Sequence, residues 1–154
     1  MAVTIASLPE AKQICGAFDY IISITDPNVK LPSLGPNHIH VRFLDAEHPD
    51  ERTYTAMVAG VTRILSWVRE HNLTGKEKIL VHCHAGVSRS AAIAWALLVM
   101  FGEDYETAYQ ALHTARPIIW PNLNVVQLAD SFLGCDGAFL RVARSVDFRS
   151  NSIF

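Results

Sequence analysis

The stretch over residues 79–101 constrains the fold more than any other part of this 154-residue chain. A short apolar run ends in His82 and Cys83, five residues follow, and Arg89 and Ser90 then open a longer apolar run. The first run has the length of a buried strand and the second that of a helix. A cysteine therefore stands where a strand ends, on a loop from which a helix begins.

A loop in this position suits an oxyanion. Backbone N–H groups of a tight loop and of a helix's first turn donate to anionic oxygens. Gly86 allows close backbone approach, and the planar guanidinium of Arg89 can grip two oxygens at once. The same positive surroundings favour the thiolate of Cys83. We therefore predict a nucleophile beside a phosphate-binding loop made of His84, Ala85, Gly86, Val87, Ser88, Arg89 and Ser90.

Each part of this pattern also has a plainer interpretation. A cysteine after an apolar strand is usually a small buried residue, and a Ser-Arg-Ser run usually caps a helix. Ser90 is expected to be such an N-cap in either case. The spacing of His82, Cys83, Gly86 and Arg89 at one strand-to-helix joint favours the functional interpretation.

These residues resemble the signature of the cysteine-dependent protein tyrosine phosphatases, and the sequence AGVSRS at 85–90 resembles the dual-specificity branch. The resemblance covers about two thirds of the chain. It implies a phosphotyrosine-phosphatase-like fold, a cysteinyl-phosphate intermediate on Cys83 and phosphate binding by Arg89. It also implies that the Ser90 hydroxyl stabilises the departing thiolate, and that the chemistry needs no cofactor and no metal.

The leaving oxygen of a phosphate ester needs a proton, which a carboxylic acid can supply. Asp45 directly follows a predicted strand over 39–44, and the family's general acid lies on a loop in that place. Asp50 on the same loop is the alternative, and Asp45 could instead only cap a turn. Cys83 and Asp45 both follow strand ends, so they are expected to face one crevice.

Two further residues are candidates for support of the loop. His82 is expected to hydrogen-bond the loop and orient Cys83. Asn122 closes a segment, 115–122, that resembles the family's Arg-Pro…Pro-Asn segment, in which the asparagine supports the signature loop. The alternative is that Asn122 caps the helix that follows, and Arg116 in the same segment is expected to be structural.

Along the whole chain, strand-like and helix-like segments alternate. This order predicts an α/β fold with a central, mostly parallel sheet of four or five strands flanked by helices. We expect one phosphatase domain over 1–154, with a polar tail from about Arg144. The predicted strands are 3–6, 18–25, 39–44 and 79–82, and the predicted helices are 7–15, 53–71, 91–101, 104–115 and 124 to 139 or beyond.

Composition and residue spacing argue against nucleic acid, a membrane, a disulfide framework and a metal as features of this protein. A net charge of −2 gives no basic footprint for nucleic acid, and the longest apolar run is too short to span a membrane. Cys15, Cys83 and Cys135 lie far apart, which favours a reducing cytoplasm over a disulfide framework. His38 and His40 would share a strand face, but no set of three or four ligands is spaced for a metal.

The most favoured function is hydrolysis of phosphate monoesters, with protein phosphotyrosine first and phosphoserine and phosphothreonine as further substrates. A phosphorylated protein or a small phosphate ester is the expected partner, and no oligomeric state is predicted. Rhodanese-like sulfurtransferases have shorter loops, and arsenate reductases need further cysteines nearby. A catalytically weak phospho-binding module and a phosphatase for non-protein esters stay open.

Overall fold

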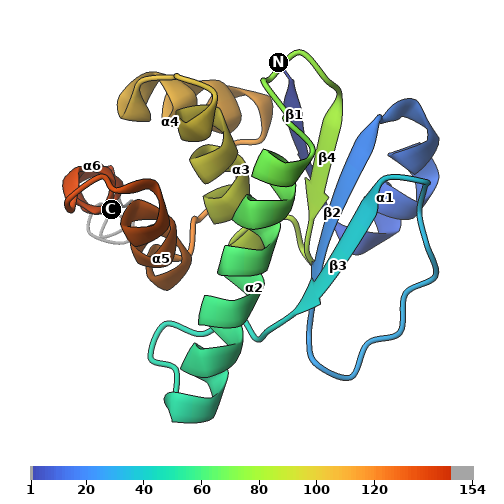
Figure 1. Ribbon diagram of the computed structural model, residues 1–154, viewed down its shortest axis with the longest axis horizontal. Helices are drawn as coiled ribbons and strands as arrows, with labels where there is room; N and C mark the ends of the chain where they lie inside the picture. Colours follow the sequence, from blue (N-terminus) through green and yellow to red (C-terminus); the bar gives the residue numbers. More distant parts are fainter. Residues whose placement is uncertain (1, 147–154) are drawn as a thin grey trace.

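A parallel sheet forms the centre of the computed structural model, which describes residues 2–146 (Figure 1). Within these residues it has four strands in the order β1-β4-β2-β3, and all three pairings are parallel. The strands are β1 (Val3–Ala6), β2 (Tyr20–Thr25), β3 (His38–Arg42) and β4 (Ile79–His82). The predicted α/β fold class with a mostly parallel sheet is confirmed.

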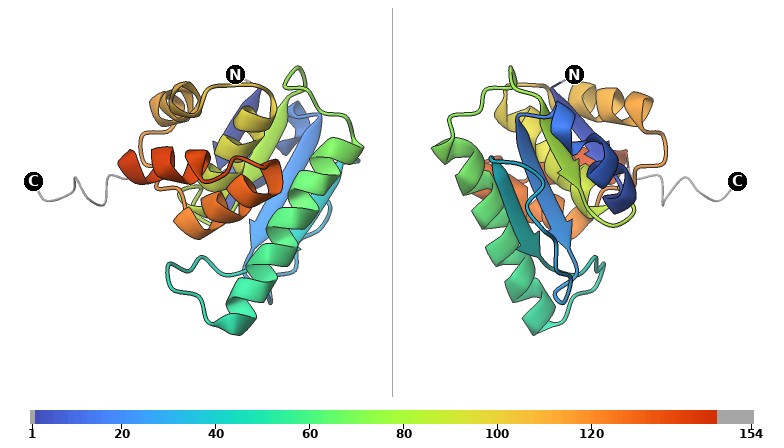
Figure 2. Two further views of the ribbon diagram at one scale, coloured as in Figure 1. Left: turned by 60° about the vertical axis from the view of Figure 1, so that its left-hand side comes forward. Right: turned by 90° about the vertical axis from the view of Figure 1, so that its right-hand side faces the viewer.

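Helices cover both faces of the sheet, as parallel strands require (Figures 1 and 2). On one face lies α1 (Leu8–Ile14), followed by a short 3-10 turn, η1 (Cys15–Ala17). The other face carries α2 (Glu51–Glu70), α3 (Arg89–Met100), α4 (Tyr105–Ala115), α5 (Leu123–Leu133) and α6 (Ala138–Ser145).

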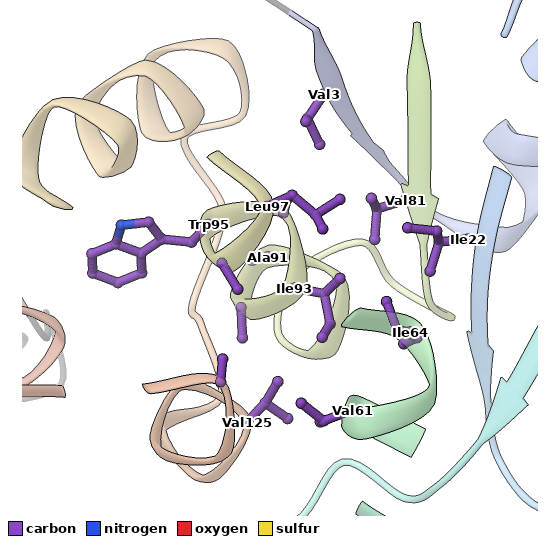
Figure 3. Packing of buried hydrophobic residues seen from close by; sticks show 14 of the residues in the cluster. Val3, Ile22, Val61, Ile64, Val81, Ala91, Ile93, Trp95, Leu97 and Val125 are labelled. Atoms are coloured by element: carbon purple, nitrogen blue, oxygen red, sulfur yellow. The ribbon is translucent and has the colours of Figure 1, made fainter. Parts of the chain in front are cut away.

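Helix α3 is the middle of the core. Every residue from Arg89 to Leu98 is buried, which explains why this segment is apolar on all sides. Figure 3 shows α3 between Val81 and Ile22 of the sheet and Val61 and Val125 of the neighbouring helices. The loop that precedes α3 is therefore anchored to a fully buried helix.

The helix predicted over 124–139 is wrong as a single element, because the structure has two helices there. Gly134 adopts the left-handed conformation that ends α5, with φ of 69°. The Asp130 carboxylate then accepts hydrogen bonds from the N–H groups of Gly137 and Leu140, at 2.9 and 3.1 Å, at the start of α6. Apolar periodicity continues across this break, so the pattern concealed it.

Other boundaries differ from the prediction by one or two residues, and two of the differences bear on the site or the tail. Strand β3 ends at Arg42, so Phe43 and Leu44 already belong to the loop that carries Asp45. The polar tail predicted from Arg144 begins inside α6, and its residues from 147 onward lie outside the described residues. No helix within 2–146 is long and apolar enough to cross a membrane.

Gly60 in the middle of α2 allows the helix to approach the loop after β3. A Cβ atom at this position would lie 2.7 and 2.9 Å from two ring carbons of Phe43, which is fully buried. We expect Gly60→Ala to destabilise the fold, because overpacking costs about 1–3 kcal/mol while the gain in helix propensity is about 1 kcal/mol. Urea unfolding measures the difference.

The matched variant is Ala59→Gly, at an exposed position of the same turn. It should cost about 1 kcal/mol through backbone entropy alone. A Gly60→Ala protein that is more stable than wild type would show that the Phe43 ring yields freely, contrary to this packing.

Candidate active site

Cys83 lies directly after β4, and its exposed fraction is only 2%. Helix α3 begins at Arg89, with Ser88 in the N-cap position but without a side-chain cap hydrogen bond. The expectation that Ser90 caps the helix is therefore wrong. Ser90 is fully buried in the first turn, where its hydroxyl oxygen lies 3.1 Å from the Cys83 sulfur.

The carbonyl groups of the loop are hydrogen-bonded from outside. Arg116 donates to two of them, through Nε to Gly86 at 2.7 Å and through Nη2 to Ala85 at 3.2 Å. The other bonds are from His82 Nδ1 to Cys83, from the Leu8 N–H to His84, from the Trp120 N–H to Val87 and from the Asn122 N–H to Ser88. Because a peptide N–H points away from its carbonyl, this pattern turns the loop's N–H groups to the inside of the loop, where those of Val87 and Ser90 bond the Cys83 sulfur.

Gly86 is required at the tightest point of the loop. Its φ is +69°, a conformation that side chains disfavour. A Cβ atom there would also lie 2.6 Å from the carbonyl carbon of Ala6 and 2.7 Å from Nη2 of Arg116. The glycine therefore lets the loop pack directly against the end of β1.

The electrostatics of the loop favour a thiolate. Burial raises the pKa of the Cys83 thiol, but this effect is outweighed by hydrogen bonds from the Ser90 hydroxyl and the N–H groups of Ser90 and Val87, and by the charge of Arg89. The net pKa lies below the ordinary value of a cysteine. The site therefore favours the thiolate, the reactive form of the sulfur, more than water does.

Hydrogen bonds hold one nitrogen of the Arg89 guanidinium in place, while another has no hydrogen-bond partner among the described residues. Nη1 donates to a carboxylate oxygen of Asp26 and to the carbonyl of Phe43, each at 2.8 Å. Nε is buried and has no hydrogen-bond partner among the described residues. A buried donor without a partner is costly, so a ligand oxygen at Nε would satisfy it.

Asp45 contacts the loop directly. Its Oδ1 atom accepts hydrogen bonds from the Ser88 hydroxyl and from Nδ2 of Asn122, each at 2.8 Å. Asn122 also caps α5 through its side-chain oxygen, as the second interpretation expected, and its backbone N–H donates to the Ser88 carbonyl of the loop. Asp50 instead caps α2, where it accepts from the Thr53 N–H at 2.8 Å.

Sequence reasoning missed Asp26 and the partner of Arg116. Asp26 follows β2, which lies beside β4, so its position at the same sheet edge was the available signal. Arg116 pairs with Glu10 at 2.8 Å and so connects the loop to the start of α1. The local sequence explains only the capping box that Glu10 forms with Ser7. It gives no signal for the contact with Arg116.

No group of three or more histidine, cysteine or acidic side chains within 2–146 converges as a metal site would require. His84, a predicted member of the phosphate-binding loop, turns its ring towards Asp26, and its Nε2 accepts the Asp26 N–H at 3.1 Å. Its backbone therefore stays in the loop, while its side chain contacts Asp26, whose carboxylate also accepts from Arg89.

A buried cysteine on a tight loop between a parallel strand and a helix is the kind of site expected of a phosphatase, and comparison with known proteins gives the family. The model of the family described as "Dual specificity phosphatase, catalytic domain" matches residues 4–130. The chain belongs to this dual specificity phosphatase family.

Individual relatives agree with this family. Mouse dual specificity protein phosphatase 14 is 36% identical over 102 residues, which are 66% of this chain and 47% of that protein. The vaccinia virus dual specificity protein phosphatase OPG106 is 35% identical over 82 residues, which are 53% of this chain and 44% of that protein. The chain thus spans about half the length of these curated relatives, or less.

Solved structures show the same fold. The PTP-2 phosphatase of Cydia pomonella has a TM-score of 0.61 and 22% identity, with 85% of each chain covered. A mouse putative dual specificity phosphatase, complexed with zinc tungstate, has a TM-score of 0.59 and 22% identity, with 89% of this chain and 85% of that chain covered.

Removal of the Ser90 hydroxyl should raise the pKa of Cys83. A hydrogen bond to a charged group contributes about 1.5–3 kcal/mol, so Ser90→Ala should move the midpoint of thiol alkylation upward by about one to two pH units. The rate of iodoacetamide reaction measured against pH gives this midpoint. Ser88→Ala, whose hydroxyl faces Asp45, should leave it near wild type, and an unmoved midpoint in Ser90→Ala would contradict the assignment.

Proposed function

We propose that this chain hydrolyses phosphate monoesters through a cysteinyl-phosphate intermediate on Cys83. The observation that carries the proposal is the loop over 83–88, whose carbonyls are all bonded from outside, while the N–H groups of Val87 and Ser90 bond the buried Cys83 sulfur and lower its pKa. A phosphate dianion fits such a ring of donors, with Arg89 Nε as one more.

In the first step the Cys83 sulfur attacks phosphorus and the bond to the leaving oxygen breaks. Asp45 gives that oxygen a proton. The Ser88 hydroxyl and the Asn122 amide both donate to Oδ1 of Asp45. This leaves Oδ2 as the oxygen that carries the proton. The products of this step are the free alcohol or phenol, the cysteinyl-phosphate and the Asp45 carboxylate.

In the second step the Asp45 carboxylate takes a proton from water, and the water oxygen attacks phosphorus. The phosphorus–sulfur bond breaks, inorganic phosphate forms and the sulfur leaves as a thiolate. The Ser90 hydroxyl, 3.1 Å from that sulfur, donates to it as the charge develops. Both steps use only residues of the loop and of the segment that carries Asp45.

Asp26 orients Arg89 in this mechanism. The carboxylate and the Phe43 carbonyl hold Nη1, and the side chain of Arg89 is only 6% exposed, so the guanidinium plane is fixed before substrate arrives. A fixed plane costs no reorganisation during the reaction. A lysine at position 89 could not occupy these positions and also reach the phosphate.

Family membership supports a phosphorylated protein as the substrate, with phosphotyrosine first and phosphoserine and phosphothreonine next. Because the chemistry needs a reduced Cys83, the proposal includes a reducing compartment such as the cytoplasm. Turnover of a panel of phosphotyrosine, phosphoserine and phosphothreonine peptides, phosphoinositides and sugar phosphates measures the substrate class.

Cys83→Ser should abolish turnover of an aryl phosphate, because a serine hydroxyl is a much weaker nucleophile at neutral pH than a thiolate. Inorganic phosphate should still bind, since the loop donors stay. Steady-state assays and calorimetric phosphate titration measure the two properties. Turnover at the wild-type rate would eliminate the cysteinyl-phosphate pathway.

Asp45→Asn should slow hydrolysis about 100-fold or more for phosphotyrosine, whose leaving group needs a proton. The loss should be much smaller for an activated nitrophenyl ester. The matched control is Asp50→Asn, which keeps an acceptable helix cap and should leave both rates unchanged. If both esters slow equally in Asp45→Asn, the acid is another residue.

A further inference from the structure

A hydrogen-bonded polar cluster occupies half of the sheet face on which α1 lies. Next to α1 this face is mostly apolar, and Ile21 and Leu80 pack there with Ala11 of α1. Towards the β3 edge the same face carries hydroxyl and imidazole groups instead, from Ser23 and Thr25 of β2, His38 and His40 of β3 and His82 of β4. Ser23, Thr25 and His82 are fully buried. The proposed chemistry uses only His82 of these, so the rest of the cluster is unexplained by it.

Three members form a chain that ends at the active-site loop. His38 Nε2 lies 2.6 Å from the Ser23 hydroxyl oxygen, and that oxygen lies 2.5 Å from Nε2 of His82. His82 Nδ1 lies 3.0 Å from the Cys83 carbonyl. In the sheet register Ser23 is the direct neighbour of His82, so backbone pairing places these two side chains together, while His38 reaches Ser23 diagonally from its position opposite Ile21.

The groups at the two ends determine which nitrogens carry protons. The Leu34 N–H is a donor 3.1 Å from His38 Nδ1, so this nitrogen accepts and Nε2 carries the proton. At the other end the Cys83 carbonyl can only accept, so His82 Nδ1 carries the proton and Nε2 accepts. Ser23 therefore accepts from His38 and donates to His82, and all four hydrogen bonds run in one direction.

We propose that Ser23 and His38 are positioning residues for the active site, which hold His82 in the tautomer that donates to the Cys83 carbonyl. This inference rests on the proposed function for its effect on turnover. Without the Ser23 hydroxyl, the Nε2-protonated tautomer of His82 becomes accessible. Its bare Nδ1 would then face the Cys83 carbonyl, and the first of the outward bonds of the loop would be lost.

Burial and nearby charges both favour neutral imidazoles in this chain of hydrogen bonds. Burial lowers the pKa of His82, against the opposing hydrogen bond to Cys83, and the charges of His84 and Lys12 lower it further. Burial and the nearby His82 lower the pKa of His38. A proton added to His82 Nε2 would turn this nitrogen into a donor that faces the donating Ser23 hydroxyl. Low pH should therefore disrupt the Ser23–His82 hydrogen bond.

The experiment compares Ser23→Ala and His38→Phe with wild type. Each should shift the alkylation midpoint of Cys83 upward by about half to one pH unit, and lower kcat roughly three- to tenfold with little change in KM, the size of one lost hydrogen bond. His38→Gln, whose amide nitrogen can donate to Ser23, should restore both values towards wild type.

His40→Phe is the matched control. His40 stacks on His38 and its Nε2 lies 2.7 Å from the Thr25 hydroxyl oxygen, but it does not bond Ser23 or His82. His40→Phe should lower the free energy of unfolding as much as His38→Phe does. It should leave the pH midpoint of Cys83 alkylation unchanged. Equal shifts in the two variants, or no shift in Ser23→Ala, would overturn the inference.

The ¹⁵N spectrum of the His82 ring is a readout that does not depend on turnover. Wild type should show a protonated Nδ1 and a bare Nε2, and Ser23→Ala should show a mixture of tautomers. A single Nδ1-protonated form in Ser23→Ala would refute the inference. If wild type lacks phosphatase activity, the proposed function fails, while this spectrum and the alkylation midpoint still test the chain of hydrogen bonds.

Discussion

The site depends on one constraint, that the loop after β4 must expose its N–H groups on the inside of its curve. Carbonyl groups then point outwards into the protein, where each needs a donor. Those donors are Arg116 and the backbone of Trp120 and Asn122 from the α4–α5 connection, Leu8 at the start of α1, and His82. The elements around the loop are thus arranged as much to bond its carbonyls as to fill the core.

Arg116 shows how this constraint extends across the molecule. Its guanidinium donates to two loop carbonyls and to the carboxylate of Glu10. The hydrogen bond from Arg116, with further bonds from Ser7, lowers the pKa of Glu10 to about 2, so the pair stays ionised at any ordinary pH. Because Glu10 also belongs to the capping box of α1, the helix on one face of the sheet and the connection on the other stabilise the same loop.

Sequence reasoning succeeded where the relevant groups are close along the chain. The strand, loop and helix around Cys83 follow from local order, and the parallel α/β fold follows from alternation. Contacts that depend on strand order could not be predicted, since Ser23 and His82 meet although they are 59 residues apart. Asp26 follows a strand end, which was an available signal, but its contact with Arg89 likewise depends on strand order. Gly134 and Gly137 did signal the break between α5 and α6, but continuous apolar periodicity outweighed them.

The central claim is that the sulfur of Cys83 takes the phosphoryl group itself. The most direct measurement is rapid acid quenching of the protein during turnover of a phosphotyrosine peptide, followed by mass spectrometry of its proteolytic fragments. The account predicts one added phosphoryl group on the fragment that contains Cys83, at the cysteine. Turnover with no phosphorylated fragment, or with the label on His84 or another side chain, would contradict it.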